Sequence, residues 1–334
     1  MSKTDAPLGE FGRIRQLFRP LAAGFAGALN LSDDAALINC PAGFELVVTT
    51  DAMVAGVHFF VDDTPEDVAA KLLRVNLSDL AAMGAQPLAY TLITSVPTTI
   101  DDAWMTRFAA SLALEQAEFG IMLAGGDSVA TPGPASFAVT AFGFVPIGQA
   151  VRRSGGQVGD RVFVTGTIGD AALALKIAFG QIAMRAGSDA LLARLRRPTP
   201  RLGLGAGVRG LVSAMADVSD GLVADLGHIA EASGVCAVVA CDRVPLSGAA
   251  RAVLDESPEL LATVLTGGDD YELVFTAPAH QAVALQELAA AAAVAITDIG
   301  HLTAPPEGRQ GGAVTVLDPQ GQPLPLTSRG WEHF

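Results

Sequence analysis

The sequence predicts an α/β (α+β) protein with two domains, on the evidence of its length, its composition and its order of elements. The chain has 334 residues, enough to bury two cores of ordinary domain size. Its residues are 50% hydrophobic and 17% charged and include 36 glycines, which is typical of a globular protein and excludes extensive disorder. β-Branched stretches alternate with helical stretches along the chain, as a mixed fold requires.

The net charge and the cysteines indicate which ligands and which cellular compartment are compatible with this protein. The net charge is −14, with 35 acidic and 21 basic residues, which argues against a nucleic-acid-binding protein. The three cysteines, Cys40, Cys236 and Cys241, lack a C-x-x-C spacing and are expected to be free thiols in a reducing compartment. The N-terminus has no apolar signal core, and no span reaches the length of a transmembrane helix. We therefore expect a cytoplasmic protein that binds neither nucleic acid nor membrane.

The sequence of the first half of the chain predicts four strands of a sheet and three helices. A helix is expected to start at Pro65 with Thr64 as its N-cap, and Gly84 is well placed to end it. His58 lies in a loop between the preceding strand and this helix. The other expected elements are a short helix at 12–18, strands at 44–51, 89–95, 121–124 and 136–145, and a helix at 101–119.

A glycine-rich and basic stretch at 151–160 changes the texture of the sequence, and we place the domain boundary just before it. The predicted domains are therefore 1–148 and 149–334. The second domain is expected to contain strands at 161–165, 237–241, 271–276 and 295–299, helices at about 170–179 and 221–232, and two or three helices between 188 and 213. A further helix is expected between the last two of these strands, and a hairpin is expected after them.

The predicted helix from Pro65 carries polar groups on an apolar face. At helical spacing Leu72, Asn76, Asp79 and Met83 share one face. A buried carboxylate costs several kcal/mol unless something neutralises it. Either a local hydroxyl or backbone N–H satisfies Asp79, or Asp79 is a metal ligand.

Acidic residues recur at turns and element ends beside small residues. Carboxylates in such positions suit Mg²⁺, which prefers oxygen ligands and bridges to phosphates. An Asp-Gly turn is more often an ordinary β-turn, so a multi-metal phosphate site and scattered surface turns both remain open on this pattern alone. The sequence lacks a P-loop, a dinucleotide-binding glycine motif, protein-kinase motifs and a G-x-S-x-G motif. The acidic motifs are Asp33/Asp34, Asp51, Asp79, Asp127, Asp217/Asp220 and Asp269/Asp270.

A larger set of motifs keeps one order and spacing from about Gly9 to Phe334. The motifs are Ser32-Asp-Asp-Ala-Ala, Thr49-Thr-Asp-Ala-Met-Val-Ala-Gly-Val-His-Phe, Asn76-Leu-Ser-Asp-Leu-Ala-Ala-Met-Gly, Gly125-Gly-Asp-Ser, Arg153-Ser-Gly-Gly-Gln-Val-Gly-Asp, Val164-Thr-Gly-Thr-Ile-Gly, Asp217-Val-Ser-Asp-Gly-Leu and Gly267-Gly-Asp-Asp-Tyr-Glu-Leu. Together they resemble the thiamine-monophosphate kinase family. The wider aminoimidazole-ribonucleotide-synthetase-like superfamily shares only the architecture and some acidic positions.

The resemblance implies a two-domain fold, with an N-terminal domain that forms a homodimer through its sheet and a larger C-terminal α/β domain. It implies transfer of the γ-phosphate of ATP to thiamine monophosphate, giving thiamine diphosphate and ADP. Two positions depart from the usual motif, since Ser32 replaces a glycine and Ser128 replaces a threonine. By resemblance, several Mg²⁺ ions are held by Asp34, Thr49, Thr50, Asp51, Asp79, Asp127, Asp217 and Asp220; ATP contacts Gly126, Asp127, Arg153 and Ser219; and the thiamine phosphate contacts His58, Asp269 and Trp331.

This reaction needs no general base, so we assign no such catalytic residue. The nucleophile is a phosphate with a second pKa near 6, so it is mostly deprotonated at neutral pH. The difficulty is to bring two polyanions together in line, which requires cations and positioning. We expect direct in-line transfer without a phosphoenzyme.

Two rival readings remain. Another ATP-dependent superfamily member, such as a selenophosphate synthetase or an amidine-forming synthetase, would share the architecture. A reactive cysteine near the N-terminus would favour selenophosphate synthetase, and no cysteine precedes Cys40. The rival from a different class is a non-catalytic metal- or nucleotide-binding protein.

Overall fold

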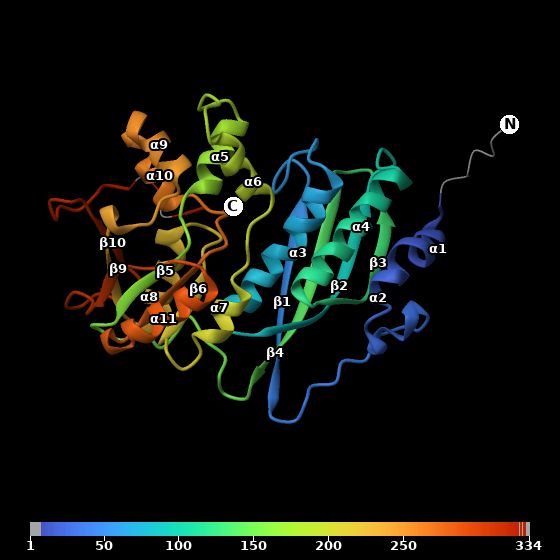
Figure 1. The fold of residues 1–334 in the computed structure, drawn as a ribbon, viewed down its shortest axis with the longest axis horizontal. Coiled ribbons are helices and arrows are strands. Elements are labelled where there is room, and N and C mark those ends of the chain that lie inside the picture. Colours follow the sequence, from blue (N-terminus) through green and yellow to red (C-terminus); the bar gives the residue numbers. More distant parts are fainter. Residues whose placement is uncertain (1–7, 327, 329, 332–334) are drawn as a thin grey trace. The chain divides into compact units, whose positions relative to one another are not determined.

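The computed structural model describes residues 8–326, 328, 330 and 331 (Figure 1). These residues form two compact units. The first unit contains the chain up to Leu80 together with Gln86–Ile147, and the second contains Ala81–Ala85 together with the chain from Gly148. The domain limits 1–148 and 149–334 stay a prediction from sequence.

The first unit is built on a four-stranded sheet with strand order β1-β4-β2-β3. β4 pairs antiparallel with both β1 and β2, and β2 pairs parallel with β3. The strands are therefore mostly those expected, although β3 continues through the Gly125–Ser128 motif that was expected to follow it. The strands are β1 (Phe44–Val54), β2 (Gln86–Val96), β3 (Met122–Ala130) and β4 (Ser136–Pro146).

Two long helices pack on this sheet, α3 (Pro65–Ala82) and α4 (Asp102–Phe119) (Figure 1). The predicted start of α3 is confirmed, because the Asp67 N–H donates to Thr64 Oγ1 at 3.2 Å and the Thr64 hydroxyl donates to the Asp67 carboxylate at 2.8 Å. Gly84 has φ +69°, the left-handed backbone typical of the residue that follows a helix. Thr64 therefore caps the start of α3, and Gly84 follows its end, as the sequence predicts.

The faces of this sheet differ in exposure. Along β1, Val47 and Met53 are buried, whereas Leu46 and Val48, the residues on either side of Val47, are exposed. Because side chains alternate along a strand, odd-numbered residues of β1 face the helices and even-numbered residues face away. We call the second side, with Leu46, Val48 and Ile93, the open face. A helical N-terminal segment completes the unit, with α1 (Glu10–Arg13), the π-helical turn η1 (Ile14–Phe18), α2 (Arg19–Ala22) and the 3₁₀ turn η2 (Ala26–Leu31).

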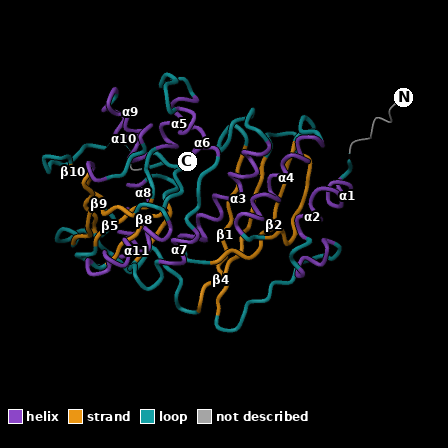
Figure 2. Tube along the Cα trace, in the orientation of Figure 1, coloured by secondary structure: helices purple, strands orange, loops and turns teal. Residues whose placement is uncertain are grey.

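The second unit contains a six-stranded sheet with order β10-β7-β9-β5-β8-β6. Its strands β5, β8, β9 and β10 are labelled in Figure 2. All neighbouring pairs are antiparallel except β10 with β7. Stacked rings of Phe163 and Phe275, 5.6 Å apart, lie in its core. The strands are β5 (Arg161–Thr165), β6 (Ala214–Asp217), β7 (Cys236–Ala240), β8 (Leu273–Ala277), β9 (Ile296–Thr303) and β10 (Val314–Leu317).

Helices of the second unit include the expected ones and two that the sequence did not predict, α9 and α10. In the described part of the chain, no helix is both long enough and apolar enough to span a bilayer. The α-helices are α5 (Asp170–Ala178), α6 (Ser188–Arg196), α7 (Leu202–Gly207), α8 (Leu222–Ser233), α9 (Gly248–Glu256), α10 (Leu261–Thr266) and α11 (Ala282–Ala292), and the 3₁₀ turns are η3 (Cys241–Arg243), η4 (Pro258–Leu260) and η5 (Ala279–Gln281).

Candidate functional site

The first unit brings together Thr49, Asp51 and Asp79 on the helix-covered face of the sheet. The Thr49 hydroxyl donates to Asp79 Oδ2 at 2.5 Å, which joins β1 to α3. Asn76, one turn earlier on α3 and fully buried, accepts from the Asp51 N–H at 3.1 Å and donates to the Leu72 carbonyl at 2.9 Å. Asn76 and Asp79 of α3 therefore hold the Thr49–Asp51 part of β1 against the helix.

Thr50 and Asp127 lie apart from this group. The Thr50 hydroxyl is 3.0 Å from Thr140 Oγ1, and alternation places it on the open face. Asp127 on β3 is in register with Ile93, whose side chain belongs to the open face. β1 and β3 are opposite edges of the sheet, so Asp51 and Asp127 are separated by three strand spacings, roughly 14 Å. One chain's sheet therefore divides the predicted metal ligands between two locations.

Gly126 is required by the sheet itself. Its φ is +153°, and a Cβ there would lie 1.9 Å from the Leu92 carbonyl oxygen. At neighbouring Gly125 a Cβ would meet nothing within 4 Å. The close approach of β3 to β2 at Gly126 sets the position of Asp127, the next residue.

Two further predicted residues of this unit lie in loops. Asp34 is exposed in a bend after η2, and within the described chain no hydrogen bond joins it to the Thr49, Asp51 and Asp79 group. His58 is half-buried, and its Nδ1 accepts from the Val54 N–H at 3.0 Å, so the ring orientation is fixed by its own loop. Lys71 of α3 donates to the His58 carbonyl at 3.0 Å, which holds the loop on the helix.

In the second unit two predicted motifs meet, the segments 217–221 and 266–272. The Asp269 N–H donates to the Ser219 carbonyl at 2.8 Å, and the Tyr271 N–H donates to the Val218 carbonyl at 2.9 Å. Gly268 allows this approach, because a Cβ there would lie 2.0 Å from the Ser219 oxygen. The Trp331 N–H donates to the Asp220 carbonyl at 3.0 Å. The structure therefore gathers Asp217, Ser219, Asp220, Asp269 and Trp331 from distant parts of the sequence.

Asp225, on the first turns of α8, holds the loop between Asp217 and the helix. Its Oδ2 accepts from the backbone N–H groups of Ser219, Asp220 and Gly221 at 3.0, 3.0 and 3.1 Å. Burial, followed by the nearby charge of Asp220, raises the pKa of Asp225 to about 7, while the N–H groups of Asp220 and Gly221 and the guanidinium of Arg153 act against the rise. Arg153 therefore lies near enough to Asp225 to act on it electrostatically.

Asp270 differs from its neighbour Asp269 in environment. It is fully buried, and its carboxyl oxygens accept from the Gly169 N–H at 2.7 Å and the Ala171 N–H at 3.3 Å, at the start of α5. Burial raises the pKa of Asp270 to about 8. Of this acidic pair, Asp270 is used as an internal cap for a helix, and only Asp269 belongs with the loop 217–221.

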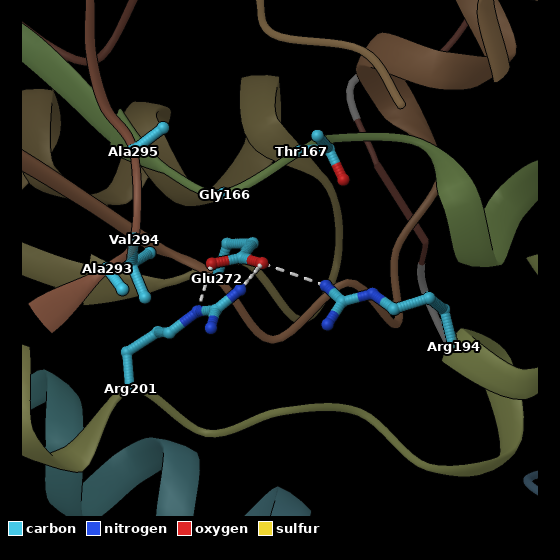
Figure 3. Close-up of a pocket in the computed structure, with 8 residues that line it drawn as sticks. All are labelled: Gly166, Thr167, Arg194, Arg201, Glu272, Ala293, Val294 and Ala295. Atoms are coloured by element: carbon cyan, nitrogen blue, oxygen red, sulfur yellow. Dashed lines mark hydrogen bonds and ion pairs between the residues drawn. The ribbon is translucent and has the colours of Figure 1, made fainter. Parts of the chain in front are cut away.

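Glu272 lines a pocket of about 270 Å³ together with Arg194 and Arg201 (Figure 3). Arg201 forms two hydrogen bonds with the Glu272 carboxylate, and Arg194 Nη2 donates to it at 2.8 Å. The Thr165 hydroxyl donates to Glu272 Oε2 at 2.7 Å, and Glu272 itself is 0% exposed. Two guanidinium groups therefore anchor the strand that begins just after Asp269 and Asp270.

Sequence reasoning missed Asp225, Glu272, Arg194 and Arg201. Glu272 stood within a quoted motif, but its partners lie some 71 and 78 residues away, and no local signal links them. Asp225 had a local signal, since a carboxylate near the start of a helix commonly accepts from the N–H groups there.

The eight residues predicted to hold Mg²⁺ have side chains that suit a hard divalent cation. Their side-chain donors are only carboxylates and hydroxyls, which are the ligands that Mg²⁺ prefers. Within the described residues, no lysine or arginine forms an ion pair with Asp34, Asp127 or Asp220. Concentrated acidic groups without such pairs are suited to cations.

Comparison with known proteins identifies relatives over nearly the full chain. Family models described as AIR synthase related protein match residues 32–145 (N-terminal domain) and 157–310 (C-terminal domain). A thiamine-monophosphate kinase from Caulobacter vibrioides is 43% identical over 98% of this chain and 92% of its own.

Solved structures agree. The crystal structure of thiamine-monophosphate kinase from Stenotrophomonas maltophilia K279a is 43% identical, with a TM-score of 0.78 over 85% of this chain and 89% of that one. A structure described as AaThiL complexed with AMPPCP and TMP covers 100% of both chains at 28% identity, with a TM-score of 0.76. The fold predicted from sequence, two AIR-synthetase-like domains of mixed α/β type, is confirmed. The chain belongs to the thiamine-monophosphate kinase family.

Proposed function

We propose that this chain transfers the γ-phosphoryl group of ATP to thiamine monophosphate, giving thiamine diphosphate and ADP. The observation that carries the proposal is full-length similarity to a kinase structure complexed with AMPPCP and TMP. Identity of 43% to a curated thiamine-monophosphate kinase over 98% of this chain supports the same activity. Both halves of the chain also carry the acidic groups that such a transfer needs.

The residues that would hold Mg²⁺ are those carried over from the family: Asp34, Thr49, Thr50, Asp51, Asp79, Asp127, Asp217 and Asp220. Bound there, Mg²⁺ would neutralise charge on the phosphate oxygens. The contacts of Asp79 with Thr49 and of Asn76 with the Asp51 backbone support this assignment, because groups that fix a ligand's orientation raise its affinity for a cation.

The residues that would contact ATP, carried over from the family, are Gly126, Asp127, Arg153 and Ser219. Arg153 is suited to triphosphate oxygens, because its planar guanidinium can donate two parallel hydrogen bonds. The Ser219 loop is held by three backbone N–H bonds to Asp225, so its groups stay in place as charge develops.

The thiamine phosphate would contact His58, Asp269 and Trp331. Trp331 is exposed and its backbone N–H donates to the Asp220 carbonyl, and an aromatic face of this kind stacks well on a cationic thiazolium or a pyrimidine. The Tyr271 hydroxyl donates to Asp269 Oδ1 at 3.1 Å, which fixes the Asp269 carboxylate. No protein base is assigned, since the attacking phosphate oxygen is already deprotonated at neutral pH.

We also propose that the protein acts as a homodimer in the cytoplasm. The open face exposes the apolar side chains of Leu46 and Val48 on β1 and of Ile93 on β2, which is typical of an interface. Free cysteines suit a reducing compartment. Light scattering should give twice the chain mass for the wild type, and Val48→Asp should shift the protein towards monomer; a monomeric wild type would contradict the proposal.

A single-turnover assay with ATP, Mg²⁺ and thiamine monophosphate tests the activity. The expected product is thiamine diphosphate, formed in step with ADP. With ATP made chiral at the γ-phosphate, inversion of configuration is expected for direct in-line transfer, and retention would show a phosphoenzyme. ATP hydrolysis without thiamine diphosphate would favour another ATP-dependent member of the superfamily.

A further inference from the structure

The start of α8 contains a group of possible metal ligands of which the Mg²⁺ proposal uses only Asp220. Asp220, Asp225 and His228 each offer one donor atom, and these atoms all lie within 4.8 Å of one another. Asp225 and His228 are three residues apart on α8, so they share one face of the helix. Asp220 is in the loop just before the helix, with its backbone fixed by Asp225.

Asp225 has a buried acceptor that no other group uses within the described part of the chain. Its Oδ1 is buried and has no hydrogen-bond partner in the described part of the chain, while Oδ2 already accepts three backbone N–H groups. Asp225 is 1% exposed. A buried carboxylate oxygen without a partner costs about 1–3 kcal/mol, so such an atom calls for a ligand.

The spacing is close to that of a coordinated ion. Two ligand atoms that bind one ion at about 2.1 Å can be at most roughly 4.2 Å apart, so a shift of about half an ångström would close the set. His228 is exposed and Asp220 is partly exposed, so the site is open to solvent on one side and needs only a rotation of these side chains. The three N–H bonds to Oδ2 would hold the ligating carboxylate in place, as hydrogen bonds do around metal ligands generally.

We propose that Asp220, Asp225 and His228 form a site for a divalent transition-metal ion of the Mn²⁺ or Zn²⁺ class, distinct in chemistry from the oxygen-only Mg²⁺ set. The imidazole nitrogen decides the class, because nitrogen ligands favour transition metals, whereas Mg²⁺ favours oxygen. The neighbouring charges are Asp220 and Asp225, which attract a cation, and Arg153, which opposes it. The two carboxylates leave a net negative charge even with Arg153 counted.

The inference shares Asp220 with the proposed Mg²⁺ set and so rests on the proposed function in that one respect. The two fail independently, because the test below detects a nitrogen ligand and does not depend on turnover. Thiamine diphosphate formation with Mg²⁺ on the same preparation reports separately on the kinase activity.

The experiment uses the full chain with sub-stoichiometric Mn²⁺ and no nucleotide, read by electron spin-echo envelope modulation. We expect ¹⁴N modulation from a directly bound imidazole, its loss in His228→Ala, and a Kd for Mn²⁺ weakened at least about tenfold in that variant. His280→Ala and His58→Ala are the matched controls, and both should keep the nitrogen signal; His280 is exposed on η5. Zn²⁺ should displace the nitrogen-coupled Mn²⁺ at far lower concentration than Mg²⁺.

His228 is exposed, so its substitution should leave the fold intact, and unchanged circular dichroism checks this. Asp225→Asn offers a second variant, because the amide keeps an oxygen for the N–H groups but loses the charge; it too should abolish the nitrogen signal. Bound Mn²⁺ without ¹⁴N modulation, or modulation that survives His228→Ala, would overturn the proposal.

Discussion

The acidic residues of the two units are held in different ways. In the first unit, Asp79 is contacted by a hydroxyl from a neighbouring strand, and Asp51 is fixed through its own backbone by Asn76. In the second unit, Asp225 and Asp270 accept from backbone N–H groups at the starts of helices, and both have raised pKa values because they are buried. Glu272 is enclosed by two arginines.

The difference separates carboxylate oxygens that can act on a ligand from carboxylate oxygens that hold the site. Asp225 has one of each, because its Oδ2 accepts three backbone N–H groups and its Oδ1 has no partner among the described residues. A half-exposed carboxylate with a hydroxyl partner can exchange that partner for a cation at little cost. A buried carboxylate bonded to backbone N–H groups cannot be withdrawn without leaving those groups unpaired. An acidic motif therefore contains both kinds, as Asp269 and Asp270 illustrate.

The largest effect is expected for Asp79→Asn, which tests the carboxylates that can act on a ligand. Loss of a ligand charge should lower kcat by at least about 10³-fold, while the Thr49 bond can still be made to the amide oxygen. Single-turnover formation of thiamine diphosphate measures the change, and the melting temperature should stay near that of the wild type. Asp189→Asn, an exposed acid on α6, is the control with full activity. Near-normal turnover in Asp79→Asn would remove its metal role.

Arg201→Met tests the buried carboxylates that hold the site in place. Removing one guanidinium from fully buried Glu272 should lower the free energy of unfolding by about 3 kcal/mol, because Arg194 alone leaves the carboxylate under-compensated. Arg185→Met is the matched control: its partner Glu256 is largely exposed, and surface pairs contribute about 0–1 kcal/mol. Urea unfolding measures both. Equal losses in the two variants would show that Glu272 is not a structural anchor.

Asp270→Asn tests the buried, structural carboxylates by the pH dependence of the free energy of unfolding. The folded pKa of about 8 lies above the ordinary value of 3.8, so the folded state holds a proton that the unfolded state releases between these values. This stabilising effect is complete below pH 4 and is lost as pH rises towards 8. An amide resembles the protonated acid, so the variant should gain on the wild type by up to about 1.4 kcal/mol per pH unit in this window. Parallel pH profiles for the two proteins would contradict the raised pKa.

Local signals in the sequence predicted most elements of the fold. The start and end of α3 followed from Thr64, Pro65 and Gly84, because capping depends on residues within one turn. The residues of the second-unit site were placed on the right segments, but their convergence was not visible, since Asp269 and Ser219 meet through a backbone bond between distant segments. The division between Thr49 and Thr50 could have been inferred from alternation along a strand; the roughly 14 Å between Asp51 and Asp127 could not, because it depends on strand order.

The smallest effect is expected for Thr64→Ala, which tests how rigidly helix α3 holds Asp79. The substitution removes the hydroxyl that accepts from the Asp67 N–H and donates to its carboxylate, so unfolding should become easier by about 1 kcal/mol. Thr64→Ser keeps the hydroxyl and should keep the stability. Asp79 lies some four turns further along α3, where Asn76, Ser78 and Leu80 are fully buried, so fraying of the first turn should not reach it. The kcat of Thr64→Ala should therefore match that of Thr64→Ser within about twofold, a difference below 0.5 kcal/mol. A larger loss of kcat at full saturation would mean that α3 moves as a whole when its first turn loosens, and that the carboxylates of the first unit depend on distant backbone bonds as much as those of the second.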